Sequence, residues 1–118
     1  MNKKTEELLE RTFNFGVSTL KLLNELQYNP IYSVTLKQLA RCATSIGANY
    51  EEAQAGESTK DFIHKIAIVS KETRESVYWL RIIKELYKEN KSIDNQILEA
   101  IELRKIFIEI KKSAQQKL

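Results

Sequence analysis

The stretch SIGANYEEAQAGESTKD, residues 45–61, decides how the middle of the chain folds. Apolar residues recur at helical spacing up to Ala53, and Gly56 follows, which predicts a helix that ends there. Ser58 and Asp61 then have the spacing of a capping box, which indicates the start of another helix. Helices joined by so short a loop must pack antiparallel. The stretch therefore predicts two neighbouring helices at the centre of a bundle.

Similar signals predict one helix before this pair and one after it. Thr5 precedes two glutamates, which suits a helix start, and Pro30 breaks that helix. Thr35 and Gln38 form a capping box for the second helix, and Ser92 caps the last one. We expect helices over about 5–27, 35–55, 59–88 and 93–114. Residues 1–118 are thus predicted to form a single all-α domain, an antiparallel up-down four-helix bundle.

The first helix has more apolar surface than a bundle requires. One apolar stripe consists of Leu9, Phe13, Gly16, Val17, Leu20 and Leu23, and the other consists of Leu8, Phe15, Leu22 and Leu26. A helix that packs only inside a bundle needs one stripe. The second stripe indicates contact with a partner subunit.

The composition excludes several classes of protein. The only cysteine, Cys42, cannot form an internal disulfide or a cysteine zinc cluster. No apolar run is long enough for a membrane span, and the N-terminal sequence turns acidic before any long apolar run, which predicts no secretory leader. We expect a cytoplasmic protein without membrane contact. The net charge is +3, with residues 58–118 carrying the excess of basic over acidic groups.

No arrangement of residues points to catalysis. His64 is the only histidine, so a histidine-rich metal site and a Ser-His-Asp triad are excluded. Paired carboxylates occur at Glu51–Glu52 and at Glu72 with Glu75, but a di-metal bundle would also need an E-x-x-H motif. We therefore predict a protein that is not an enzyme and that has no metal or cofactor.

A polar stripe runs along the second helix, opposite its apolar face. Its members are Gln38, Arg41, Ser45, Ala48, Asn49 and Glu52. Gly47 lies at the edge of the apolar side, where it would admit a neighbouring helix. One interpretation is a solvated face on which Arg41 pairs with nearby acids. The other is a hydrogen-bonded network with Glu72 or Glu75 that fixes the register of the bundle or a subunit contact.

Basic residues on the last two helices form candidate nucleic-acid-binding surfaces. They are Arg74, Arg81 and Lys88, spaced seven residues apart, and Arg104, Lys105, Lys111 and Lys112. Tyr78 is interleaved with the first three. Such a pattern can follow a phosphate backbone, although an ordinary lysine-rich surface is the alternative.

Residues 38–83 resemble the signature of the four helix bundle proteins. This group includes the proteins encoded in intervening sequences of bacterial 23S ribosomal RNA genes. The matching positions are Gln38, Arg41, Ser45-Ile46, Ala48-Asn49, Glu52, Asp61-Phe62, Lys71-Glu72, Glu75 and Tyr78-Trp79-Leu80. The chain is also similar to the accessory variability protein of diversity-generating retroelements. The resemblance implies a left-handed bundle that assembles as a homopentamer, a partner that is structured RNA or DNA, and contact with a nucleic-acid-processing protein such as a reverse transcriptase.

Two functional hypotheses follow. The first is a non-enzymatic homo-oligomer that binds structured RNA, or an RNA–protein complex, through the seven basic residues. The second is a protein-interaction adaptor, in which the polar stripe with Glu72, Glu75 and Trp79 forms the contact. In either case we expect Asn49→Leu or Glu52→Ala to disturb assembly more than any binding surface, because both positions are mid-helix beside Gly47.

Overall fold

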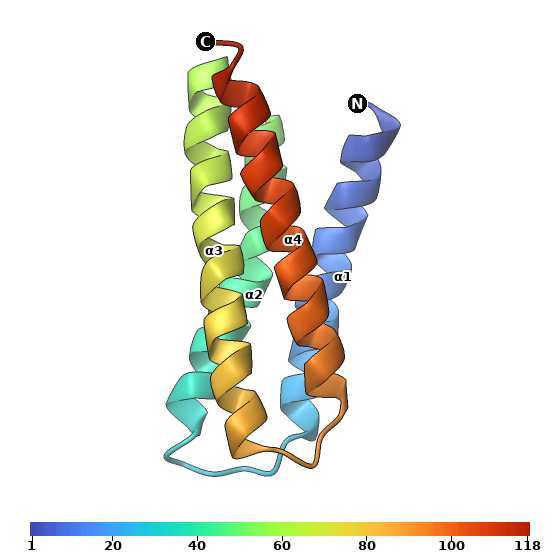
Figure 1. The fold of residues 1–118 in the computed structure, drawn as a ribbon, viewed down its shortest axis with the longest axis vertical. Coiled ribbons are helices and arrows are strands. Elements are labelled where there is room, and N and C mark those ends of the chain that lie inside the picture. The colour runs from blue at the N-terminus through green and yellow to red at the C-terminus, as the bar shows by residue number, and fades with distance from the viewer.

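The computed structural model describes residues 1–118 as four helices (Figure 1). They are α1 (Lys3–Glu25), α2 (Ser33–Gln54), α3 (Thr59–Leu86) and α4 (Ser92–Gln115). Each helix runs antiparallel to the next, in an elongated bundle with extents of 47 × 24 × 19 Å. The predicted all-α up-down bundle is confirmed, and every helix end lies within two residues of its expected position.

The start of α3 follows its predicted signal, whereas the start of α1 does not. Ser58 accepts a hydrogen bond from the backbone N–H of Asp61 at 3.1 Å, which confirms this cap. Helix α1 is instead capped by Asn2, whose Oδ1 accepts from the backbone N–H of Thr5 at 2.8 Å. Thr5 therefore lies inside the first turn.

The predicted caps of α2 and α4 are wrong for the same reason. The capping box at Thr35 does not form, because α2 begins two residues earlier, after a turn in which Asn29 Oδ1 accepts from Ile31 N–H at 2.9 Å. Ser92 is the first residue of α4, and its N–H donates to Asn90 Oδ1 at 2.9 Å. In both places the side-chain oxygen of an asparagine upstream of the helix accepts a backbone N–H hydrogen bond, and the predicted cap residue lies inside the helix.

The core is a continuous cluster of apolar side chains from all four helices. The stripe predicted for α2 is buried at Leu39, Ala43, Ile46, Tyr50 and Ala53. On α4 the apolar residues of the sequence predict a core face of Ile93, Ile97, Ile101, Phe107 and Ile108, and this is only partly right. Ile93 and Phe107 are buried, together with Ala100 and Leu103, whereas Ile97, Ile101 and Ile108 are half-buried. None of the helices has an apolar stretch long enough to cross a membrane.

The two apolar stripes of α1 have different environments. Phe15 and Leu22 belong to one stripe and lie in the core. Phe13 and Leu20 belong to the other stripe, and they are 63% and 46% exposed. The stripe that remains for a partner is therefore the one with Phe13 and Leu20, not the one with Phe15 and Leu22.

Helix α1 diverges from α4 toward its N-terminus (Figure 1). In the C-terminal half of α1 the two helices are joined: Gln96 Nε2 on α4 donates to Ser18 Oγ at 3.0 Å and to Thr19 Oγ1 at 2.8 Å. Further along, Arg11 makes two 2.7 Å hydrogen bonds to the carboxylate of Glu99. Beyond this ion pair the helices separate, and a cleft of about 480 Å³ opens between them.

Candidate nucleic-acid interface

The structure divides the seven predicted basic residues into two groups. Three lysines each pair with a glutamate three residues earlier, at 3.5–3.8 Å: Lys88 with Glu85, Lys105 with Glu102, and Lys112 with Glu109. The other four residues make no ion pair: Arg74, Arg81, Arg104 and Lys111. Among the seven predicted residues, these four have no carboxylate within ion-pair distance.

Two of the unpaired arginines enclose an exposed aromatic ring on α3. Arg74, Tyr78 and Arg81 are spaced by four and three residues, so they lie on successive turns of one helix face. All three are exposed, and Tyr78 is 55% exposed. The Tyr78 ring contacts Trp79 edge to face, with centroids 5.0 Å apart and an interplanar angle of 76°. We call Arg74, Tyr78 and Arg81 the α3 ridge.

A shallow hollow lies on each side of the α3 ridge. The hollow between α2 and α3 has a volume of about 510 Å³, and its lining includes Arg74 and Trp79. The hollow between α3 and α4 has a volume of about 600 Å³, and its lining includes Arg81 and Ile97. Tyr78 lines both hollows, so its ring divides them.

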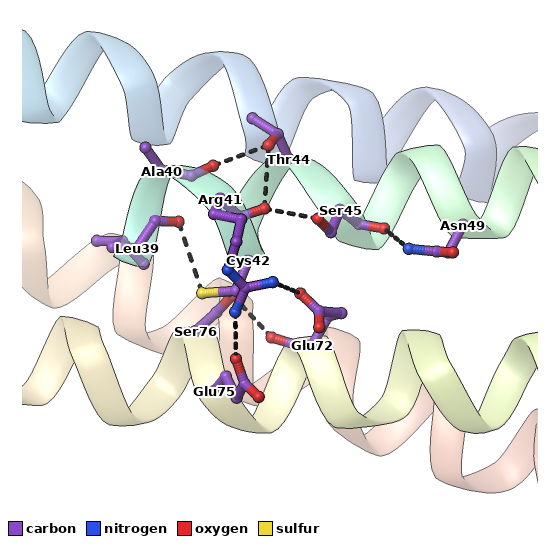
Figure 2. A network of polar contacts seen from close by, with 10 residues as sticks. All are labelled: Leu39, Ala40, Arg41, Cys42, Thr44, Ser45, Asn49, Glu72, Glu75 and Ser76. Carbon is purple, nitrogen blue, oxygen red and sulfur yellow. Dashed lines mark hydrogen bonds and ion pairs between the residues drawn. The ribbon is translucent and has the colours of Figure 1, made fainter. Parts of the chain in front are cut away.

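Beside the ridge, Arg41 joins α2 to α3 (Figure 2). Its guanidinium donates to Glu72 Oε2 at 3.2 Å and to Glu75 Oε2 at 2.6 Å. Figure 2 shows the Arg41 side chain reaching from α2 to lie between the two carboxylates. Both interpretations of the polar stripe are compatible with an ion pair of Arg41, and its partners are Glu72 and Glu75 at once. The contact lies within one chain, and any part in a subunit contact stays a prediction.

The carboxyl group of Glu72 is almost fully buried beneath Arg41, with 6% of the residue exposed. Burial raises the pKa of Glu72 above its ordinary value, because a carboxylate loses hydration there. The positive charge of Arg41 opposes this shift, whereas the neighbouring charge of Glu75 adds to it. Arg41 therefore compensates an ionised group that the fold has partly removed from water.

The network continues into the core through Ser76 and Cys42 (Figure 2). Ser76 Oγ lies 2.9 Å from the backbone oxygen of Glu72 and 3.3 Å from Cys42 Sγ. Cys42 is fully buried, and this burial raises the pKa of its thiol. A protonated, inaccessible thiol is chemically inert, so Cys42 is a packing residue here.

The remaining polar stripe of α2 does not reach another helix. Asn49 Nδ2 donates to the backbone oxygen of Ser45 at 2.9 Å, within α2 itself. Glu52 is exposed and makes no ion pair. The register role expected of Asn49 and Glu52 is therefore not seen within the chain, since Arg41 makes the interhelical bonds. Their expected role in assembly stays a prediction.

Gly47 permits a close approach of α2 to α1, as predicted. A Cβ atom at this position would lie 3.3 Å from the backbone carbon of Thr12. Beside this contact lies a mainly apolar groove of about 330 Å³. It is lined by Leu9, Thr12, Phe13, Gly16, Val17, Leu20, Thr44, Gly47, Ala48 and Glu51. This α1–α2 groove holds the exposed stripe of α1.

The polar groups elsewhere form no metal-binding cluster. No group of three histidine, cysteine, aspartate or glutamate side chains lies close enough to hold an ion. His64 is exposed near the start of α3.

The structure shows two candidate binding features that the residues predicted from the sequence do not include. Tyr78 is not among the predicted binding residues, although the spacing of Arg74 and Arg81 encloses it. The α1–α2 groove is also missing. Its signal is a pair of glycines, Gly16 and Gly47, on helices that are neighbours in sequence.

The fold and these surfaces define an antiparallel four-helix bundle with an arginine-flanked aromatic on one face and an apolar groove on another. Comparison with protein families assigns residues 4–109 to the 23S rRNA-intervening sequence protein family. The chain belongs to this family, which confirms the resemblance inferred from its signature.

The crystal structure of a similar protein supports the same assignment. It is described as a protein with unknown function from the S23 ribosomal protein family, from Bacteroides thetaiotaomicron VPI-5482. Sequence identity is 31%, the match covers 92% of this chain and 98% of the other, and the TM-score is 0.82. No curated protein matches the chain at a significant level.

Proposed function

We propose that the protein is a non-enzymatic homo-oligomer that binds structured RNA, or an RNA–protein complex, through the basic faces of α3 and α4. The supporting observation is that four of the seven predicted residues have no carboxylate partner, whereas the other three are each paired with a glutamate. The four are Arg74, Arg81, Arg104 and Lys111. Unpaired cations on helix surfaces contact phosphates, which gives affinity that depends on salt and little on base sequence. The family description refers to 23S rRNA, which makes RNA the first nucleic acid to test.

The proposal is tested by fluorescence anisotropy with an RNA hairpin at about 50 mM and about 200 mM salt. We expect affinity to fall steeply with salt. Reversing three of the four unpaired charges, in Arg74→Glu with Arg81→Glu and Arg104→Glu, should weaken binding by more than tenfold and flatten the salt dependence.

The matched control reverses the three paired lysines, in Lys88→Glu with Lys105→Glu and Lys112→Glu. This variant has the same net charge as the first, and we expect the smaller loss of affinity. Equal losses would mean that only net charge matters. No salt-dependent binding by the unmodified protein would contradict the proposal itself.

The oligomeric part of the proposal is supported by the α1–α2 groove. Phe13 and Leu20 expose apolar area that a second copy of the chain would cover, and the resemblance implies a homopentamer. We expect Phe13→Lys to reduce the mass measured by sedimentation equilibrium to that of one chain. Leu98→Lys, an equally exposed leucine on α4, is the control and should leave the mass unchanged. A single-chain mass for the unmodified protein would contradict this part.

The second candidate is a protein-interaction adaptor without nucleic-acid binding. Its predicted contact was the polar stripe with Glu72, Glu75 and Trp79, but Arg41, Glu72 and Glu75 are paired within the chain. We therefore assign the partner contact to the α1–α2 groove instead. In that case an affinity pull-down recovers a partner protein, such as a nucleic-acid-processing enzyme, even after nuclease treatment. Phe13→Lys should abolish its recovery, and the α3 ridge variants should not. For both candidates we propose a cytoplasmic location, which suits the reduced, buried thiol of Cys42.

A further inference from the structure

The α3 ridge is suited to a more particular ligand than a phosphate backbone. Tyr78 is 55% exposed, and its hydroxyl makes no hydrogen bond within the chain. By contrast, Tyr87 donates its hydroxyl to the backbone oxygen of Gln27 at 2.8 Å and contacts the ring of Tyr32. Tyr87 thus has a clear role in joining chain segments. Tyr78 has no such role, and the fold does not account for its exposure.

The ring of Tyr78 is nevertheless held in place. It is braced by the edge-to-face contact with Trp79, which packs against the core. An aromatic ring held by a half-buried neighbour loses less conformational freedom when a ligand stacks on it. The hollows on either side leave space next to the ring on the α2 side and on the α4 side.

The charges around the ring favour an anionic ligand. The acidic groups that line the two hollows each have a cation beside them: Glu75 pairs with Arg41, which it shares with Glu72, and Glu85 pairs with Lys88. Lys84, also in the lining, is paired with Asp94 at 2.7 Å. The remaining unpaired charges in the lining are the guanidinium groups of Arg74 and Arg81. The backbone positions of Arg74 and Arg81 lie about 10 Å apart along the helix axis, one on each side of Tyr78.

We propose that the α3 ridge binds an unpaired nucleotide of RNA, with its base stacked on Tyr78 and the flanking phosphates held by Arg74 and Arg81. The bases of a continuous duplex are stacked on each other and present no free face, whereas bases in loops, bulges and single strands do. Stacking on an aromatic side chain together with arginine–phosphate contacts is the usual chemistry of single-strand recognition. The inference rests on the proposed function and narrows its target to RNA with unpaired residues.

The test compares two RNAs with the same number of phosphates, a hairpin with an open loop and a blunt perfect duplex. A fluorescent adenine analogue, 2-aminopurine, is placed in the loop, because its emission is quenched when it stacks. We expect the protein to bind the hairpin more tightly than the duplex and to quench the probe. Tyr78→Leu should weaken hairpin binding about tenfold, abolish the quenching and leave duplex affinity unchanged.

Two variants serve as controls. Tyr78→Phe retains the ring and should keep both the affinity and the quenching, whereas Tyr28→Leu removes an exposed tyrosine outside the ridge and should change neither. If Tyr78→Leu binds and quenches like the unmodified protein, the stacking inference is wrong while the proposed function stands. Equal affinity for hairpin and duplex would also overturn it. If neither RNA shows salt-dependent binding, the proposed function fails as well.

Discussion

The two sides of the bundle are held together differently. Between α2 and α3, Arg41 binds two carboxylates, and Ser76 carries the polar network inward to the buried Cys42. Between α1 and α4, contact is limited to one half of α1, and the other half borders an open cleft. The ion pair of Arg11 with Glu99 lies at that boundary and is largely exposed.

The difference shows which helix is available for other contacts. Helices α2 and α3 are joined next to the α3 ridge by a network that reaches the core, whereas α1 contacts α4 through a few hydrogen bonds and one exposed ion pair. Helix α1 also carries the exposed Phe13 and Leu20. A helix that is loosely attached on one side and apolar on another gains more from a partner subunit than the α2–α3 pair does.

The largest expected effect is the difference in unfolding free energy between core substitutions on the two sides. Ile66→Ala removes a fully buried side chain of α3 and should lower the free energy of unfolding by about 3 kcal/mol. Leu8→Ala removes a half-buried side chain of α1 at the cleft and should cost about 1 kcal/mol. Urea unfolding of both variants measures this contrast. Equal losses would mean that α1 is packed as firmly as α3.

A smaller effect is expected from the two interhelical arginines. Arg41→Ala leaves the buried carboxylate of Glu72 without its cation and should cost about 1–2 kcal/mol. Arg11→Ala breaks an exposed pair and should cost about 0.5 kcal/mol. The same unfolding measurements compare them. A greater loss for Arg11→Ala would reverse the order of importance that the burial of Glu72 indicates.

The smallest effect is a pH dependence confined to the α2–α3 side. The pKa of Glu72 is raised in the folded state. Just above pH 4.5, a larger fraction of folded than of unfolded chains therefore carries this proton. The contribution of Glu72 to stability therefore declines as pH rises from there to the raised pKa. Unfolding free energies measured between about pH 4 and about pH 7 should show this decline relative to Glu72→Gln. Parallel curves for the two proteins would mean that the pKa is not raised.

Much of the fold was predictable because helical periodicity and short loops leave few arrangements for four helices. The helix starts were less predictable. Asn2, Asn29 and Asn90 each bind backbone N–H groups ahead of the residues that match capping patterns. Which stripe of α1 is buried was also undetermined, since both stripes are equally apolar and only the position of α2 and α4 distinguishes them.

The residue types of the candidate site were predictable from the sequence, but their arrangement in space was not. A glutamate three residues before Lys88, Lys105 and Lys112 is visible in the sequence and accounts for their pairing. The place of Tyr78 between two hollows depends on how α2 and α4 pack against α3, which periodicity along one helix does not define. The contact of Arg41 with two carboxylates depends on the same packing.

The buried Cys42 allows the opening of the folded bundle to be measured chemically. As the only thiol in the chain, it gives a single, unambiguous site for an alkylating reagent. Because the folded chain shields the sulfur completely, each labelling event requires the bundle to open around Cys42. The alkylation rate under native conditions, divided by the rate for the unfolded chain, therefore gives the equilibrium population of opened molecules. RNA bound at the ridge can then be tested for a decrease in that population, with Cys42 as the only labelled position.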